Sequence, residues 1–294
     1  MTDLSDAAVP STAPSGSFRI GGDLEVDRLG YGTMQIIGPG YWGPARDEAE
    51  AVRVLRRAVE LGVNLIDTAD AYGPFHAEQL IAKALRPYRD DLVIATKGGV
   101  VRPRPGEWQP VGRPEYLRHA LELSLRHLGL ERIDLYQLHR VDPQVPLEES
   151  LGELRELQQE GKIRHIGLSE VSVEEIERAR LVVDVVSVQN MYNLVERSAQ
   201  DVLDHTTREN IAFIPWFPVA TGRLAAPGGP LDALAKEYDA SPAQLALAWL
   251  LHRAPNVLPI PGTSKVAHLE ENIAASSVRL GAADIEALNR AVTA

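Results

Sequence analysis

IDLYQLHRVDPQVPLEESLGELRELQQEGKIRHIGLS, residues 133–169, contains the unit that decides the fold. A short apolar run at 133–138 is followed by an amphipathic stretch at 147–160 and by a second apolar run at 163–169. Short apolar runs between turn residues are typical of buried strands, whereas apolar residues spaced three and four apart are typical of a helix. The unit therefore predicts two strands joined by a crossover helix.

The same alternation continues on both sides of this unit. The candidate strands are Arg28–Tyr31, Val63–Asp67, Leu92–Thr96, Ile133–Leu138, Ile163–Ser169, Val185–Gln189, Ala212–Phe217 and Val257–Ile260. The candidate helices are Glu48–Leu61, Ala77–Leu85, Pro114–Leu128, Leu147–Glu160, Val173–Arg180, Ala199–Glu209, Pro242–Leu251 and Val266–Ala274. Strands that alternate with helices in this way predict an α/β protein built as one (β/α)8 barrel. A doubly wound open sheet is the main alternative, but no Gly-x-Gly-x-x-Gly turn opens the first predicted helix.

The N-terminal segment differs from the rest of the chain. Residues 1–17 are rich in Ala, Ser, Thr, Pro and Gly, and we predict a disordered tail there. A short hairpin should follow, with strands at Phe18–Ile20 and Leu24–Val26 joined by a turn at 21–23. We therefore expect a single barrel domain over residues 18–294.

Composition excludes several classes of protein. The chain has no cysteine, so disulfides and thiolate zinc sites are excluded, and we expect no metal site. Its net charge is −11 without a basic stripe, which argues against a nucleic-acid partner. No apolar run approaches the roughly 18 residues that a membrane span needs, and no secretory signal is visible. We expect a cytoplasmic protein; the sequence does not indicate an oligomeric state.

Polar residues end three successive predicted strands, where the active site of a barrel lies. These are Asp67, Lys97 and His139, and Tyr72 follows Asp67 in the next loop. Each has a purely structural alternative: a turn cap, a solvated lysine, a half-buried histidine and a packing aromatic. An acid, an amine, an imidazole and a phenol at one barrel end favour the catalytic interpretation.

Five segments around these residues resemble the aldo-keto reductase family, in the order that the family has them. They are 64–73 (NLIDTADAYG), 94–97 (IATK), 134–139 (DLYQLH), 161–169 (GKIRHIGLS) and 188–190 (VQN). Residues 29–35, 38–40 and 260–264 are most similar to bacterial pyridoxal-reductase-like members. The resemblance covers essentially the whole chain after the tail. It implies NADPH-dependent reduction of an aldehyde to the alcohol, and pyridoxal to pyridoxine is one such reaction.

The resemblance also implies a role for each of the four residues. Tyr72 supplies the proton as general acid. Lys97 is the cation expected to lower the pKa of Tyr72, and Asp67 balances the charge of Lys97. His139 donates a hydrogen bond to the carbonyl oxygen or steers it towards Tyr72.

Cofactor contacts are implied for a larger set of residues. These are Gly32, Thr33, Met34, Ser169, Gln189, Trp216, Phe217, Val219, Gly222, Arg223, Gly262, Thr263, Ser264, Lys265, His268, Glu271 and Asn272. The segment 260–272 crosses from a strand into a helix N-terminus, which favours anions. The chain departs from the family at Glu170, where asparagine is common, and at Gly262 and His268, where lysine and arginine are common. Lys265 is therefore expected to hold the 2′-phosphate.

The substrate is less strongly indicated. Trp42, Trp108 and Arg140 lie on predicted loops at the barrel mouth and favour a flat aromatic aldehyde with an anionic or phenolic oxygen. Two alternatives remain open: a reductase acting on many small aldehydes and ketones, and a regulatory subunit that binds the cofactor but turns over slowly.

Overall fold

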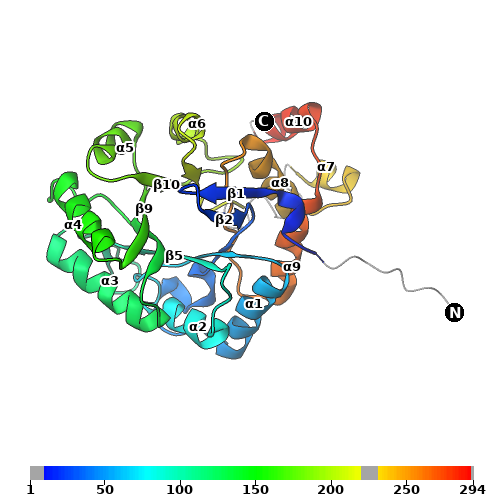
Figure 1. Cartoon of the computed structure of the whole chain (residues 1–294). Coiled ribbons are helices and arrows are strands. Elements are labelled where there is room, and N and C mark those ends of the chain that lie inside the picture. The colour runs from blue at the N-terminus through cyan, green and yellow to red at the C-terminus, as the bar shows by residue number, and fades with distance from the viewer. Residues whose placement is uncertain (1–9, 220–230, 293–294) are drawn as a thin grey trace.

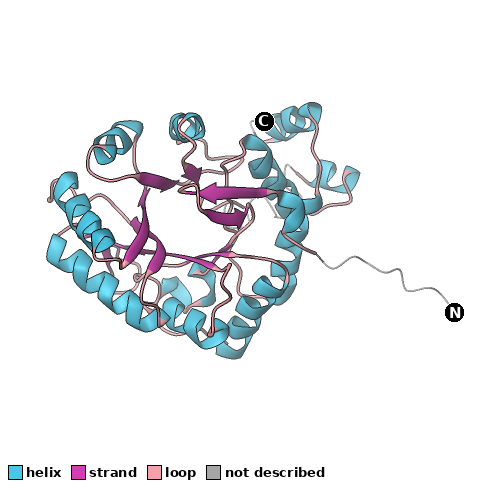
Figure 2. Cartoon of the chain, in the orientation of Figure 1, coloured by secondary structure: helices cyan, strands magenta, loops and turns pink. Residues whose placement is uncertain are grey.

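Parallel strands form the wall of a barrel. The computed structural model describes residues 10–219 and 231–292. Its parallel sheet has the strand order β11-β10-β9-β8-β5-β4-β3. The bounds are β3 Tyr31–Gly32, β4 Leu65–Asp67, β5 Val93–Gly98, β8 Ile133–Leu138, β9 Ile163–Ser169, β10 Val185–Gln189 and β11 Ala212–Phe213. Figures 1 and 2 show the strands around the centre of the molecule and the helices outside them.

Residues 256–260 close the ring between β11 and the segment before β3. Phe213 donates its amide to Asn256 O at 2.8 Å, and Leu258 donates to Phe213 O at 2.8 Å. On the other side, Gly30 donates to Pro259 O at 3.0 Å. The predicted (β/α)8 barrel is therefore confirmed. The expected strand at 257–260 is reduced to a single bridge at Val257, because prolines 259 and 261 have no N–H to continue a ladder.

Helices surround this ring. Their bounds are α1 Glu48–Glu60, α2 His76–Leu85, α3 Pro114–Leu128, α4 Leu147–Gln159, α5 Val173–Arg180, α6 Gln200–Arg208, α7 Asp232–Glu237, α8 Pro242–Arg253, α9 Val266–Ala274 and α10 Ala282–Ala291. All the predicted helices are confirmed, whereas α7 and α10 were not predicted. Within the described residues, no helix has the length and apolar character to cross a membrane.

The N-terminal hairpin, β1 Ser17–Ile20 with β2 Leu24–Asp27, closes one end of the barrel. Gly21 and Gly22 have positive φ in the turn, as predicted for this sequence. Ile20 and Leu24 belong to the same apolar cluster as Leu65 of β4, which lies inside the ring. Because the hairpin packs at the amino ends of the strands, the carboxyl ends form the open mouth.

We expected a disordered tail over residues 1–17, and this prediction is wrong for residues 10–17. Thr12 is buried, donates its amide to Leu61 O at 3.1 Å and donates its hydroxyl to Asp27 at 2.5 Å. Ser276 donates its hydroxyl to Ser11 O at 2.6 Å. Hydrogen bonds, which the composition does not reveal, therefore fix this apolar-poor segment. Residues 1–9 lie outside the described part of the chain.

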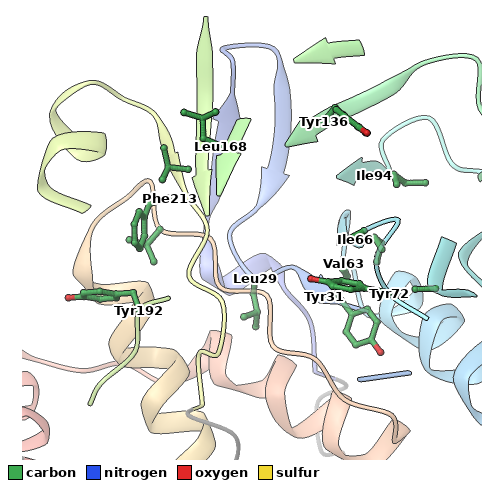
Figure 3. Close-up of a cluster of buried hydrophobic side chains, with 14 of the residues drawn as sticks. Leu29, Tyr31, Val63, Ile66, Tyr72, Ile94, Tyr136, Leu168, Tyr192 and Phe213 are labelled. Carbon is green, nitrogen blue, oxygen red and sulfur yellow. The ribbon is translucent and has the colours of Figure 1, made fainter. Parts of the chain in front are cut away.

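A buried apolar layer fills the space between strands and helices. Ile66, Ile94, Tyr136 and Leu168 contribute to it from successive strands, as Figure 3 shows. Tyr72 belongs to the same cluster although it lies on the loop after β4. Packing therefore holds the tyrosine that the sequence marks as the general acid.

Candidate active site

Lys97, near the end of β5, is completely buried and lies at the centre of the site. Its Nζ donates to Asp67 Oδ2 at 2.7 Å, to Thr68 O at 2.8 Å and to the hydroxyl of Tyr72 at 3.5 Å. Lys97 thus directly contacts Asp67 and Tyr72, two other residues that we predicted from strand and loop positions. The ammonium has a carboxylate on one side and the phenol on the other.

Burial alone would favour the neutral amine of Lys97, because a buried charge loses its hydration. The carboxylate of Asp67 and the neighbouring Tyr72 outweigh that effect and raise the pKa of Lys97 above its ordinary value. Lys97 is therefore charged at neutral pH. A permanent cation next to the phenol stabilises negative charge on its oxygen.

Two glutamines hold the second oxygen of Asp67. Gln189 Nε2 donates to Asp67 Oδ1 at 2.8 Å, and Gln137 Nε2 donates to the same atom at 3.3 Å. Gln189 was expected to contact the nicotinamide, and in the structure its amide also orients the aspartate. Gln137 was not predicted; its position one residue before the end of β8 is the only sequence signal for it.

The expected effect on Tyr72 is corrected by the structure. Burial raises the pKa of Tyr72 above its ordinary value, and the charge of Lys97 only opposes that rise. The expectation of a lowered pKa neglected burial, which cannot be read from the spacing of the residues. At neutral pH Tyr72 is a protonated phenol, which is the form that a general acid needs.

His139 lies next to Tyr72 at the end of β8, with ring centroids 6.0 Å apart in an edge-to-face arrangement. Burial lowers the pKa of His139 well below its ordinary value, and the charges of Lys97, Arg140 and Arg102 act in the same direction. The imidazole is therefore neutral. Its Nδ1 is buried without a partner among the described residues. A bound carbonyl oxygen near the ring can accept a hydrogen bond from it, provided that the tautomer places the proton on the facing nitrogen.

Glu170, where the family commonly has asparagine, holds the indole of Trp216 in this structure. Its Oε1 accepts hydrogen bonds from Trp216 Nε1 at 2.6 Å and from the amide of Met191 at 2.7 Å. The backbone of Glu170 has φ +56°, a left-handed conformation that is unusual for a residue with a side chain. The carboxylate thus fixes the indole of Trp216. Arg140, which follows His139, donates a hydrogen bond to Ser169 Oγ at 3.1 Å.

Most of these side chains line one cavity of about 760 Å³ at the barrel mouth, whereas Lys97, Gln137 and Glu170 lie outside its lining. Most of the predicted site residues meet there: Gly32, Met34, Asp67, Tyr72, Trp108, His139, Arg140, Ser169, Gln189, Trp216, Phe217, Val219, Gly262, Thr263, Ser264 and His268. Gln35, Tyr41, Pro218 and Ile260 also line it. Gln35, Tyr41 and Pro218 directly adjoin predicted residues, and Ile260 lies two positions before Gly262, so closeness in the sequence was the available signal.

Other predicted residues lie elsewhere. Thr33 is buried and does not line the cavity, with its hydroxyl unpaired within the described part of the chain. Trp42 packs against Arg102, whose guanidinium carbon is 5.7 Å from the centre of the indole ring. Glu271 and Asn272 lie on α9, outside the residues that line the cavity. Gly222 and Arg223 fall in 220–230, outside the described residues.

Lys265 does not line the main cavity. It faces a second cavity of about 540 Å³, which Arg46 also lines. The two cavities share Met34, Gln35, Tyr41 and Ser264 in their linings. The N-terminus of α9, expected to favour an anion, already has one: Val266 donates its amide to Glu50 Oε1 at 3.2 Å. A 2′-phosphate near Lys265 would therefore have a carboxylate beside it.

Helix α2 carries a buried acid, Glu78. Glu78 is completely buried, and its Oε1 accepts a hydrogen bond from Thr96 at 2.7 Å. Burial raises the pKa of Glu78 to about 7, and the hydrogen bond from Thr96 acts in the opposite direction. The folded state therefore holds a proton that the unfolded chain releases near the ordinary value of 4.5.

Because the folded pKa of Glu78 is raised, the contribution of Glu78 to wild-type stability should fall as pH rises from 4.5 to about 7. Glu78→Gln removes this titration. We expect its free energy of unfolding, relative to wild type, to be higher at about pH 8 than at about pH 5, by up to about 3 kcal/mol. Urea denaturation at both pH values measures it. Glu131→Gln, at an exposed position, should follow wild type; parallel pH dependence of Glu78→Gln and wild type would contradict the expectation.

The comparison with known proteins agrees with this geometry. A model described as the aldo/keto reductase family matches residues 28–293. The chain belongs to the aldo/keto reductase family. The resemblance inferred from the five sequence segments is therefore confirmed.

Two relatives have similar lengths. The chain is 47% identical over 280 residues to an uncharacterized oxidoreductase of Schizosaccharomyces pombe, covering 95% of this chain and 91% of that protein. It is 45% identical over 265 residues to pyridoxine 4-dehydrogenase of Escherichia coli, covering 88% and 92%.

Solved structures share the fold over nearly the whole chain. The glycerol dehydrogenase of Gluconobacter oxydans superposes with a TM-score of 0.86 at 27% identity, covering 95% of each chain. An aldo/keto reductase of Klebsiella pneumoniae in complex with NADP and acetate gives a TM-score of 0.79 at 27% identity, covering 93% and 94%.

Proposed function

We propose that this protein is an NADPH-dependent aldehyde reductase that converts pyridoxal to pyridoxine. The observation that carries the proposal is the contact between the phenol of Tyr72, which lines the main cavity, and the buried ammonium of Lys97. The Escherichia coli relative is named for dehydrogenation of pyridoxine at position 4. Reduction of pyridoxal is the reverse of that reaction.

The residues of the cavity fit a nicotinamide cofactor. The Trp216 indole, held by Glu170, offers a fixed aromatic face, and Ser169 and Gln189 offer polar groups beside it. Thr33, between the lining residues Gly32 and Met34, has a buried hydroxyl without a partner among the described residues. The Klebsiella pneumoniae protein was crystallised with NADP. When bound, the nicotinamide would supply the hydride.

The chain's own residues would supply the proton and the electrostatic stabilisation. Tyr72 is protonated at neutral pH and donates its proton to the carbonyl oxygen. Lys97 stabilises the phenolate that this transfer leaves, and Asp67 keeps the ammonium charged and in place. Neutral His139 hydrogen-bonds to the same carbonyl oxygen and holds it near Tyr72.

The other end of the cofactor would lie along Thr263, Ser264 and His268. We propose that Lys265 meets the 2′-phosphate next to Ser264, which lines both cavities. Glu50 lies next to this position and opposes a phosphate dianion. The preference for NADPH over NADH should therefore be moderate.

Aromatic groups support a ring-shaped substrate. Trp108 lies 6.4 Å from Tyr72 and 6.2 Å from His139, measured between ring centroids, so its indole forms a wall beside the acid. Tyr41 continues that wall at 6.3 Å from Trp108. Arg140 also lines the cavity and can pair with a phenolic oxygen of the substrate.

A substrate panel tests the proposal. We expect pyridoxal to be reduced with NADPH at a kcat/KM at least about tenfold above that of butanal, because the alkanal gains neither ring nor phenolate contacts. Pyridoxal 5′-phosphate, a substituted benzaldehyde, and NADH with pyridoxal complete the panel. Equal kcat/KM for pyridoxal and butanal would indicate a broad aldehyde reductase instead. Cofactor binding without turnover on any aldehyde would indicate a regulatory subunit.

A further inference from the structure

Arg102 joins three loops at the mouth of the main cavity. It follows β6 Val100–Val101, which pairs with β7 Gln109–Pro110 in a small hairpin that carries Trp108. The guanidinium is largely buried, with 7% of the residue exposed. Such a position is expensive for a charged group unless every donor is satisfied.

Backbone carbonyls from all three loops accept its hydrogen bonds. Arg102 Nε donates to Glu107 O at 2.9 Å, next to Trp108. Its Nη1 donates to Tyr41 O at 3.0 Å and to Ala71 O at 3.2 Å, the residue before Tyr72. Its Nη2 donates to Gly40 O at 3.0 Å. A planar fork of donors can hold these carbonyls together in a way that an ammonium cannot.

The same guanidinium supports the aromatic wall. Its central carbon lies 3.6 Å from the centre of the Trp108 ring, which is direct stacking. Trp108 in turn contacts Tyr41, Tyr72 and His139 through ring edges and faces. The position of the indole over the reacting groups therefore depends on Arg102, although Arg102 itself does not line the cavity.

We infer that Arg102 is a positioning residue that makes the enzyme select ring-shaped aldehydes, by holding Trp108 against the catalytic tyrosine and histidine. This inference rests on the proposed aldehyde reduction. Arg102 would thus influence the choice of substrate without contacting the substrate. Arg102→Lys separates the effect of the planar set of donors from the effect of the charge, because lysine keeps the cation and loses the planar donors.

The test is the ratio of kcat/KM for pyridoxal to that for butanal, measured on one preparation with NADPH. Such a ratio is independent of the fraction of active protein. For Arg102→Lys we expect the ratio to fall at least about fivefold, because a displaced indole no longer stacks on the substrate ring. The matched control is Arg104→Lys, an arginine of the same hairpin that is largely exposed and pairs with Glu107; its ratio should equal that of wild type.

A double-mutant cycle with Trp108→Leu shows whether Arg102 acts through the indole. Trp108→Leu should lower the ratio, and Arg102→Lys should add nothing in the double variant, because coupled residues are non-additive. An Arg102→Lys ratio within about twofold of wild type, or additive decreases, would overturn the inference. If Arg102→Lys does not fold, an unchanged ratio in Trp108→Leu overturns it. A wild type that does not prefer pyridoxal would instead contradict the proposed substrate. The failure of the proposed substrate and the failure of the proposed role of Arg102 are therefore distinguishable.

Discussion

Replacing Tyr72 with phenylalanine should lower kcat for aldehyde reduction at least about 100-fold, since general acid catalysis contributes about 10²–10⁴. Phenylalanine keeps the ring that packs in the buried cluster and removes only the hydroxyl that contacts Lys97. The affinity for NADPH should stay nearly unchanged. Steady-state kinetics with pyridoxal and fluorescence titration of NADPH measure the two quantities.

The structure explains why the effect should fall on turnover and not on binding. The phenol is a protonated group that lines the cavity, and Lys97 is placed to stabilise its conjugate base. Turnover of Tyr72→Phe within about tenfold of wild type would remove Tyr72 from the role of general acid.

Replacing Lys97 with methionine should also lower kcat at least about 100-fold, because the phenolate left by proton transfer would be without the cation that contacts it directly. It should destabilise the fold as well. Asp67 would keep a buried charge supported by amides alone, and an unpaired buried charge costs about 3–5 kcal/mol. Urea denaturation and steady-state kinetics measure the two effects.

The double variant Asp67→Asn with Lys97→Met separates stability from catalysis. Asparagine removes the unpaired charge, so most of the stability should return, whereas turnover should not. Recovery of turnover together with stability would show that Lys97 has only a structural role.

Three of the four proposed catalytic residues could be found from sequence because each lies at or near the carboxyl end of a recognisable strand. Asp67, Lys97 and His139 are polar residues at the ends of apolar runs, and parallel strands bring such ends together. Tyr72 was placed by its distance from Asp67. The predicted direction of the pKa shift of Tyr72 was wrong, because this shift depends on burial, and burial involves packing from distant segments.

Residues that act through backbone atoms could not be found in this way. Arg102 binds carbonyls of residues 40, 41, 71 and 107, and no periodicity or motif links these positions. Glu170 looked like a departure from the family pattern, and only the structure shows its bond to Trp216. The bonds of Thr12 likewise leave no trace in a segment of small polar residues.

We propose that this chain transfers hydride from NADPH to the aldehyde carbon of pyridoxal, with Tyr72 as the proton donor. The most direct measurement uses NADPH with deuterium at the transferable position of C4 and follows the product by mass spectrometry and NMR. We expect the wild type to form pyridoxine with one deuterium on the new carbinol carbon, and Tyr72→Phe to form almost none. Oxidation of NADPH without deuterated pyridoxine, or equal product from both proteins, would contradict it.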